Sequence, residues 1–429
     1  MSSACPRTDR RCRSRCCGLL AVALAAAAGC GDDPAPDRGA LERVAVPGDD
    51  LDVLEELAHV GYVDHAEVDE NTTSGVVLCD DQRAWAGYNL VTSIPDSRAT
   101  LFDMQGRVLR SWTDPEVADT RWSRAEVLEN GDVLCLSPKE DFLSRQSWDG
   151  RILWRLPLNV HHDAIEIPGG ELLVLTRRFR VIPQIDPVRQ CVDNLLTLVS
   201  SDGRVLEEHS LYDILSATPE ILAVKAPAGI ADLPPGYNVD PIHANTVQWL
   251  SRPELFELNP LFAPGNVLVT LRYLDSIAVI DLEERRCLWA WGAGELEGPH
   301  DASVLENGHV LLLDNGYEER GYSRVVELDP RERRIVWEYR APNPCDFFTS
   351  GRGTVQALPN GDVLVGSSNS GEAFEITRAG QVVWRYLNPF VDAQGARGVI
   401  RIQRYEPAFI ERFLKTDGPS ERAGGGRGG

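Results

Sequence analysis

Short apolar runs separated by tight polar turns recur along the middle of this 429-residue chain. In residues 125–136 and 302–313 an apolar run, an Asn-Gly turn and a second apolar run follow one another. Residues 355–365 repeat the unit, and residues 164–175 carry Pro-Gly-Gly at the turn instead. Asn-Gly tolerates the positive φ of a two-residue type I′ turn, so each unit is predicted to form two antiparallel strands.

A second pair of apolar segments follows each predicted hairpin, most clearly in residues 323–329 and 334–339. The last segment often carries a tryptophan, and these residues are Trp112, Trp154, Trp289, Trp337 and Trp384. Large aromatic side chains at one position of a repeat are typical of packing between neighbouring units. We therefore interpret this series as structural.

Six such units are found, and they begin near Val76, Ala125, Ala164, Asn245, Ala302 and Val355. Four antiparallel strands per unit, arranged radially, leave few exposed sheet edges. The repeat predicts an all-β fold, a six-bladed β-propeller of four-stranded antiparallel blades, over residues 75–390. We expect a tether and short helix in 30–74, and a C-terminal tail in 391–429 whose end is disordered.

The N-terminus has the pattern of a processing segment. Five arginines precede a twelve-residue apolar stretch, residues 18–29, which is too short to span a bilayer comfortably. The following Cys30 completes a sequence that resembles a bacterial lipobox. We expect a lipoprotein signal peptide in residues 1–29, a lipidated Cys30, and a lipid-anchored protein of the bacterial cell envelope, periplasmic or at the cell surface. An ordinary signal peptide or an uncleaved anchor is the alternative.

Charge and cysteine content exclude some functions. The formal net charge of −22 repels phosphate backbones, so no nucleic-acid partner is expected. Cysteines beyond the predicted lipidation site are far apart and form no CxxC pair, and they are Cys79, Cys135, Cys191, Cys287 and Cys345. This spacing does not indicate a zinc site, and it allows at most two disulfides.

Histidines recur at one position of the repeat. His162 and His300 each stand seven residues before the turn position of their hairpin, and His243 has a comparable place in a unit with an insertion. Because the first strands of all blades start beside the same end of a propeller channel, these side chains are predicted to converge.

Further polar residues are predicted at the same opening. The second strand of each hairpin returns to that face and brings Arg177, Arg272 and Asn315, while Asn245 and Arg352 lie close to the predicted strand starts. Such a cationic, donor-rich pocket suits an anion. Three histidines could also bind zinc, but apart from Asp163 and Asp301 no carboxylate or cysteine stands in an obvious fourth position, and we expect neither a metal ion nor another cofactor.

In this order the motifs give the chain a resemblance to the bacterial arylsulfotransferase family over roughly residues 75–410. The motifs are Gly87–Leu90, Leu101–Trp112, His161–Asp163, His243–Asn245, Leu271-Arg272, Ser276–Asp281, His300-Asp301, Leu313–Gly316 and Ser370–Thr377. The resemblance implies a six-bladed envelope propeller that moves sulfuryl groups from phenolic sulfate donors to phenol acceptors, independently of nucleotide sulfate.

The resemblance also implies roles for individual residues. His300 is expected to attack sulfur and form a sulfohistidine, with His162 as the other candidate. Arg272, Asn245 and His243 would bind the sulfuryl oxygens, and His162 would bind sulfate or protonate the leaving phenolate. Arg177, Asn315, Arg352 and Asp301 are expected to contact substrate. The alternative functions are a non-catalytic, lipid-anchored binding scaffold and a propeller enzyme with a quinone cofactor.

Overall fold

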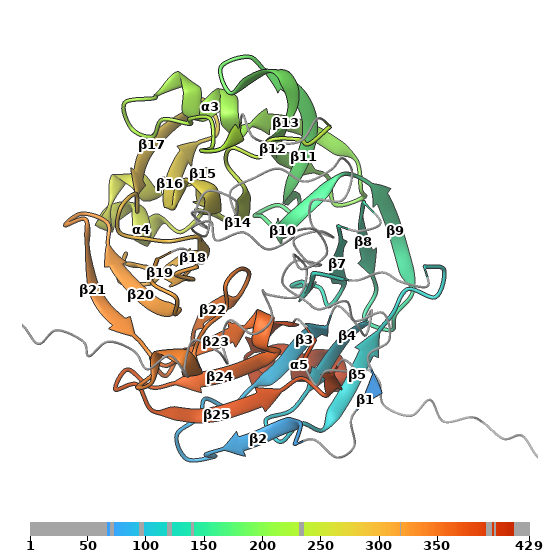
Figure 1. Ribbon diagram of the computed structural model, residues 1–429. Coiled ribbons are helices and arrows are strands. Elements are labelled where there is room, and N and C mark those ends of the chain that lie inside the picture. The colour runs from blue at the N-terminus through green and yellow to red at the C-terminus, as the bar shows by residue number, and fades with distance from the viewer. Residues whose placement is uncertain are drawn as a thin grey trace, which may run out of the picture.

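Six antiparallel sheets stand around one axis in the computed structural model of the chain (Figure 1). The described residues are 67–68, 73–93, 98–117, 122–138, 141–230, 236–317, 319–391, 397–398 and 400–415. The expected signal peptide, Cys30, most of the expected tether and the last residues of the expected tail lie outside them. The prediction of a six-bladed propeller is confirmed.

Each sheet is a blade with its first strand innermost. Blade 1 consists of β27 (Ile400–Tyr405), β3 (Tyr88–Ser93), β4 (Arg98–Phe102) and β5 (Val108–Trp112). Blade 2 consists of β6 (Arg124–Val127), β7 (Val133–Ser137), β8 (Phe142–Gln146) and β9 (Ile152–Pro157). Blade 3 consists of β10 (Val160–Glu166), β11 (Leu172–Ile182), β12 (Asp186–Val199) and β13 (Val205–Ser210).

The other three blades follow the same order. Blade 4 consists of β14 (Ala244–Trp249), β15 (Asn266–Leu271), β16 (Ser276–Asp281) and β17 (Arg286–Trp291). Blade 5 consists of β18 (Pro299–Val304), β19 (Val310–Asp314), β20 (Arg324–Asp329) and β21 (Arg334–Tyr339). Blade 6 consists of β22 (Thr354–Ala357), β23 (Val363–Ser367), β24 (Glu372–Ile376), β25 (Val382–Leu387) and an added outer strand, β2 (Gly75–Cys79).

Short elements complete the described chain. Strands β1 (Glu67–Val68) and β26 (Phe390–Val391) form a small ribbon. The α-helices are α3 (Leu211–Ala217), α4 (Pro253–Leu258) and α5 (Pro407–Leu414), and the 3₁₀ turns are η4 (Pro260–Phe262), η5 (Arg272–Leu274), η6 (Pro344–Asp346) and η7 (Ser368–Ser370). A helix with the length and apolarity to cross a membrane is not found in this part of the chain.

The two ends of the propeller differ from the expected boundaries. Val76 does not open a blade, because β2 pairs with β25 at the outer edge of blade 6. Residues 400–405, expected in a tail, form β27, which pairs with β3 and supplies the innermost strand of blade 1. The ring is thus closed by a strand from the far end of the chain. A search for hairpins cannot find this pairing, since no turn joins β27 to β3.

The Asn-Gly turns have another geometry than the predicted type I′. Gly131, Gly308 and Gly361 have φ of 87°, 79° and 89°, whereas the asparagine before each is not among the residues with positive φ. Each glycine N–H donates to the carbonyl three residues earlier, as in a type I turn followed by a G1 bulge. The asparagine contributes through its side chain, whose Oδ1 accepts the N–H two residues on.

The tryptophan series ties neighbouring blades together, as predicted. The indole N–H of Trp112 donates to the carbonyl of Trp148 in the next blade, at 2.9 Å. Trp154, Trp337 and Trp384 make the same link to Ser201, Arg378 and Met104, the last across the ring closure. In blade 4 the link comes from Trp291, whose indole N–H donates to the carbonyl of Arg333. The guanidinium of Arg333 stacks on Trp289.

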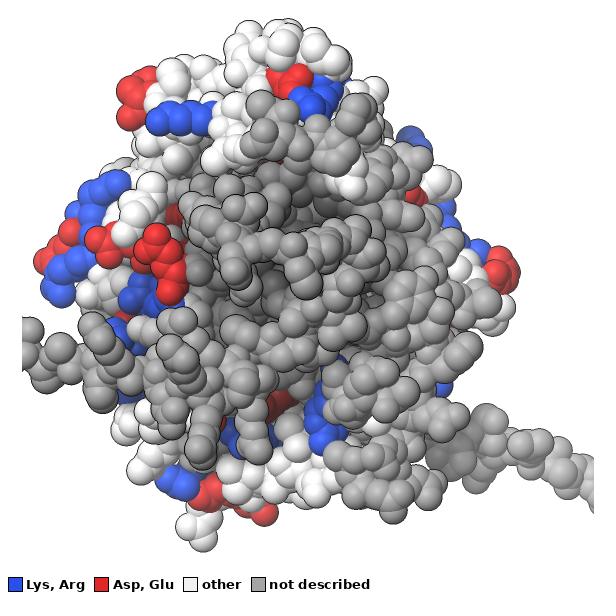
Figure 2. All heavy atoms as spheres, viewed as in Figure 1, with Lys and Arg blue, Asp and Glu red and all other residues white. Residues whose placement is uncertain are grey.

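Charged side chains of both signs gather at the outer edge beside β20 and β21 (Figure 2). Ion pairs there include Arg324 with Glu338 and Arg334 with Glu332. The pair of Arg334 and Glu332 is exposed, and exposed pairs contribute little to stability. The blades are held instead by buried apolar clusters between neighbouring sheets, such as the one that joins Leu175 of β11 to Val247 of β14 and Val269 of β15.

Candidate functional site

Four consecutive blades have a strained residue where the innermost strand begins. His162, His243, Asp301 and Arg352 have φ of 59°, 50°, 54° and 59°, which is unusual for residues other than glycine. Pairing with the second strand shifts register at this point in β10, β14 and β18. Bulges and left-handed residues re-aim side chains and cluster at functional sites. In this protein the bulges lie between the first residues of β10, β14 and β18 and the regularly paired part of each strand. These strands are near the axis of the propeller (Figure 1).

A cavity of about 50 Å³ opens among these strand starts. Its walls are Thr92, Trp122, Ser123, His162, Asn245, Thr246, His300, Arg352, Gly353, Thr354, Ser368, Ile400 and Arg401. The structure therefore brings together four of the predicted site residues, His162, Asn245, His300 and Arg352. Sequence reasoning missed Arg401, because it lies on β27, the strand that was expected to be tail.

The imidazole of His300 is buried and its hydrogen bonds define its tautomer. Nδ1 lies 2.7 Å from Oδ1 of Asn315 and 3.0 Å from the carbonyl oxygen of Gly298, so it must carry the proton. Nε2 therefore has the lone pair, and it accepts the backbone N–H of Arg352 at 3.0 Å. Burial and the positive charge of Arg272 lower the pKa of His300 to about 3, which leaves the ring neutral.

Asn315 orients His300, a role different from the substrate contact expected for it. While its Oδ1 accepts the Nδ1 proton, its amide donates to the carbonyl oxygens of Thr349 and Arg352, at 2.6 and 2.8 Å. One amide thus fixes both the ring and the segment that touches Nε2. Asn245 likewise donates to the carbonyl oxygen of Pro299, 3.0 Å away, just before His300.

Arg272 contacts two tyrosine rings beside this segment. Its guanidinium carbon stands 5.2 Å from the ring centroids of both Tyr273 and Tyr317, and the residue is 5% exposed. Its backbone N–H donates to the carbonyl of His243 at 3.0 Å. Gly351 comes so close that an added Cβ would stand 3.2 Å from Nη2. Stacking of this kind holds the planar fork in one orientation.

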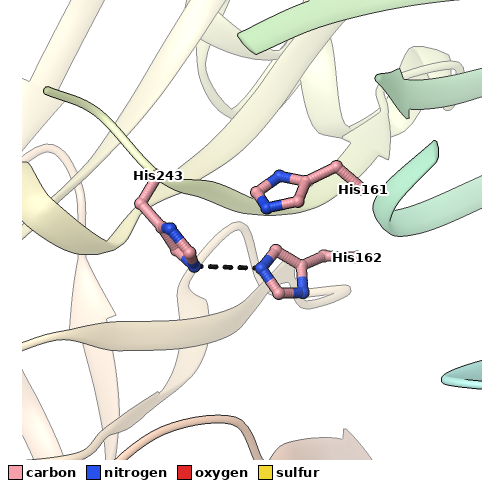
Figure 3. Close-up of side chains that lie close together, drawn as sticks. All are labelled: His161, His162 and His243. Atoms are coloured by element: carbon pink, nitrogen blue, oxygen red, sulfur yellow. Dashed lines mark hydrogen bonds between the residues drawn. The ribbon is translucent and has the colours of Figure 1, made fainter. Parts of the chain in front are cut away.

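His161, His162 and His243 form a cluster of three imidazoles (Figure 3). The Nε2 atoms of His162 and His243 are 2.9 Å apart, and the ring centroids of His161 and His162 are 3.9 Å apart. Burial, and then the neighbouring His161 and His243, lower the pKa of His162. Sequence reasoning grouped His300 with these histidines and gave His161 no role at the site.

A carboxylate that sequence reasoning missed completes the cluster. Oδ2 of Asp240 lies 2.9 Å from Nδ1 of His243, and both residues are buried. Burial raises the pKa of Asp240, but the hydrogen bond and charge of His243 outweigh it and the net shift is downward. The signal was in the sequence, since Asp240 stands three residues before His243 in the segment that leads into β14.

The three imidazoles also have the composition of a metal site, because one nitrogen from each lies within 4.8 Å of the others. Two nitrogens bound to one tetrahedral zinc stand about 3.4 Å apart, given Zn–N bonds near 2.0–2.1 Å. The 2.9 Å between His162 and His243 is shorter and fits a shared hydrogen bond. We therefore interpret this pair as a proton-carrying unit.

The remaining predicted residues, among them Arg272, are not among the residues that line the cavity, and they have other partners. Asp301 accepts the N–H of Val355 in the next blade at 2.8 Å, and Asp163 accepts that of Val247 at 2.9 Å, so the two aspartates link blades. The guanidinium of Arg401 stands 3.5 Å from Asp301 and 3.6 Å from Asp163. Arg177 is buried 3.6 Å from Asp141 and is not among the residues that line the cavity.

Fold and site together define a six-bladed propeller that holds histidines, arginines and amides around a small cavity at the starts of its innermost strands. A family model described as arylsulfotransferase (ASST) matches residues 124–389, and the chain belongs to this family. The matched segment runs from β6 to the end of blade 6 and contains every predicted site residue from His162 to Arg352. Membership implies aryl sulfate donors and phenol acceptors in general.

The other comparisons give only remote similarities to solved structures. No curated protein matches the sequence. A protein of unknown function from Bacteroides caccae is 15% identical, with a TM-score of 0.48 over 75% of this chain and 100% of its own. A streptogramin B lyase is 13% identical, with a TM-score of 0.44 over 80% of this chain and 98% of its own.

Proposed function

We propose that this protein is an arylsulfotransferase that moves a sulfuryl group from an aryl sulfate to a phenol through a sulfohistidine on His300, without a nucleotide sulfate. The observation that carries the proposal is the state of His300. Its Nδ1 proton is held by Asn315 and its ring is neutral, so Nε2 has a lone pair. His300 also lines the cavity. A neutral imidazole of fixed tautomer is a competent nucleophile.

In the first half-reaction the Nε2 lone pair forms the N–S bond while the S–O bond to the aryl group breaks. The phenolate leaves with that electron pair and takes a proton from His162, which lines the same cavity. The N–H of Arg352 must leave Nε2 before attack, and it then becomes a donor to a sulfuryl oxygen. Arg272 and the second amide N–H of Asn245 supply further donors.

In the second half-reaction an acceptor phenol returns its proton to His162. Its oxygen forms the new S–O bond as the N–S bond breaks, and His300 regains its lone pair. Sulfuryl transfer resembles phosphoryl transfer, in which positioning and charge stabilisation provide most of the catalysis. Arg272 suits the role of oxygen donor, because its planar fork, which contacts the rings of Tyr273 and Tyr317, matches the oxygens of a sulfuryl group.

The test is exchange between 4-nitrophenyl sulfate and phenol. We expect release of 4-nitrophenol that depends on the acceptor, and its loss in His300→Ala. His309→Ala is the matched control, because His309 pairs with Glu327 and does not line the cavity. Wild-type protein that shows no turnover with any aryl sulfate, together with His300→Ala that retains biological function, would favour the binding scaffold.

We also propose that the protein is anchored in the bacterial envelope by a lipid on Cys30. The support is the arginine-rich, apolar, small-residue pattern that precedes Cys30. Mass spectrometry of protein from the membrane fraction should find Cys30 as the first residue, with acyl chains attached. Cys30→Ala should move the protein out of that fraction, whereas a wild-type protein whose chain still starts at Met1 contradicts the proposal.

A further inference from the structure

We propose that Asp240 is a positioning residue that works through His243 to let His162 protonate the leaving phenolate. The inference rests on the proposed function and adds to it a residue that touches no substrate. It is carried by one continuous chain of contacts, Asp240 to His243 to His162, with 2.9 Å between the paired atoms at each step. The outer end of this chain, His162, lines the cavity that also contains His300.

The two carboxylate oxygens of Asp240 have separate tasks. Oδ1 accepts the backbone N–H groups of Ile242 and His243, at 3.1 and 2.8 Å, which caps the turn before β14. Oδ2 faces the imidazole of His243. A residue needed only for the turn would use one oxygen, as an asparagine can. The second oxygen sets the tautomer of His243, because a carboxylate requires a proton on Nδ1.

That tautomer decides what His243 can offer to His162. With Nδ1 protonated against Asp240, an additional proton resides between the two Nε2 atoms, and the buried carboxylate balances its charge. Nδ1 of His162 lies on the side of the ring away from His243 (Figure 3). When Nδ1 gives its proton to the phenolate, Nε2 takes the shared proton from His243. The pair of His162 and His243 then holds one proton fewer, and the acceptor phenol restores that proton in the second half-reaction.

Asp240→Asn is expected to remove control of the His243 tautomer while keeping the turn before β14. Its amide oxygen can still accept the two backbone N–H groups, so the NH₂ group then faces Nδ1 of His243 and reverses the tautomer. His243 now has one proton, on Nε2, and cannot replace the one that His162 would give up. A reversed tautomer is also the reason that the equivalent change disables a Ser-His-Asp triad.

The experiment compares two donors in the wild type and Asp240→Asn, with sulfohistidine formation measured in a single turnover. Phenyl sulfate releases a strongly basic phenolate that needs a proton, whereas 4-nitrophenyl sulfate releases a weakly basic one that leaves unaided. General acid catalysis typically contributes about 100-fold or more. We expect a loss of that size with phenyl sulfate and a loss below about fivefold with 4-nitrophenyl sulfate.

Two further variants make the result decisive. His243→Gln must show the same dependence on the leaving group, and it decides the matter if Asp240→Asn does not fold. Glu327→Gln is the matched control, because it disturbs the carboxylate–imidazole pair of Glu327 and His309 outside the cavity and should affect both donors equally. Equal losses with both donors in Asp240→Asn and His243→Gln, or no loss, would overturn the inference.

Failure of the inference can be distinguished from failure of the proposed function. If the wild type forms a sulfohistidine with 4-nitrophenyl sulfate and the variants show no dependence on the leaving group, sulfuryl transfer stands and the relay is wrong. If the wild type forms no adduct with either donor, the proposed function itself is wrong.

Discussion

The Nδ1 atom of His300 donates its proton to Oδ1 of Asn315 across 2.7 Å. This single bond fixes which nitrogen can attack, because the other ring nitrogen must then keep its lone pair. Asn315 reaches His300 from the end of β19, the second strand of the same hairpin, so the nucleophile and its orienting residue belong to one blade. The predictions below depend on this arrangement.

Asn315→Asp is expected to raise the pKa of His300, because a carboxylate beside Nδ1 stabilises the imidazolium. At mildly acidic pH a larger share of the variant is then protonated at Nε2 and cannot attack. Sulfohistidine formation should decrease between pH 8 and pH 5 in the variant more steeply than in the wild type. Asn360→Asp, in the turn between β22 and β23, should keep the wild-type profile; identical profiles for Asn315→Asp and the wild type contradict the orienting role.

The buried, neutral His300 should also make stability depend on pH. Its folded pKa is about 3, lowered by burial and by Arg272, whereas an unfolded histidine has a pKa near 6.5. Between these values the unfolded chain binds a proton that folded His300 does not, so stability decreases as pH falls through this window. From pH 8 to pH 5 the loss is about 2 kcal/mol for this group.

The measurement is urea unfolding of the wild type and His300→Gln at pH 8 and pH 5. Other titrating groups contribute to both proteins. The wild type should therefore lose about 2 kcal/mol more than the variant on acidification. A difference that stays constant with pH would show that His300 titrates normally in the folded protein.

Arg272→Lys should lower transfer by about 100-fold although it keeps the charge, since loss of one preorganised donor has an effect of this size. An ammonium group neither offers a planar fork nor stacks in the same way on Tyr273 and Tyr317. The rate of burst formation is the readout. Arg180→Lys, whose guanidinium carbon stands 5.7 Å from the ring centroid of Tyr212 in blade 3, outside the proposed site, serves as control, and equal effects of the two substitutions would remove Arg272 from the site.

The hairpin repeat in the sequence predicted most of the ring. Each hairpin is local, so strand starts such as His162 and His300 could be compared directly. Closure of the ring is not local, because β27 pairs with β3 across more than three hundred residues. For this reason Arg401 was missed, and Val76 was predicted to begin a blade although β2 pairs at the outer edge of blade 6. The link from Asp301 to Val355 was out of reach for a related reason, since Val355 belongs to the next blade.

The closing strand makes a testable contribution to stability through Tyr405. Its hydroxyl oxygen accepts the backbone N–H of Val127 in blade 2 at 2.9 Å, and both residues are buried. Tyr405→Phe leaves that N–H without a partner, which costs about 1–3 kcal/mol. Urea denaturation should show this decrease at an unchanged slope. An unchanged midpoint would mean that the bond between β27 and blade 2 adds nothing.

The central claim is covalent transfer through His300, and mass spectrometry tests it most directly. Wild-type protein is mixed with 4-nitrophenyl sulfate in the absence of an acceptor, and the digested peptides are analysed for a sulfuryl group. We predict a stoichiometric burst of 4-nitrophenol, a single modified peptide containing His300, and loss of the mass increase when phenol is added. Turnover without a modified histidine, or the sulfuryl group on His162 instead, would contradict the account.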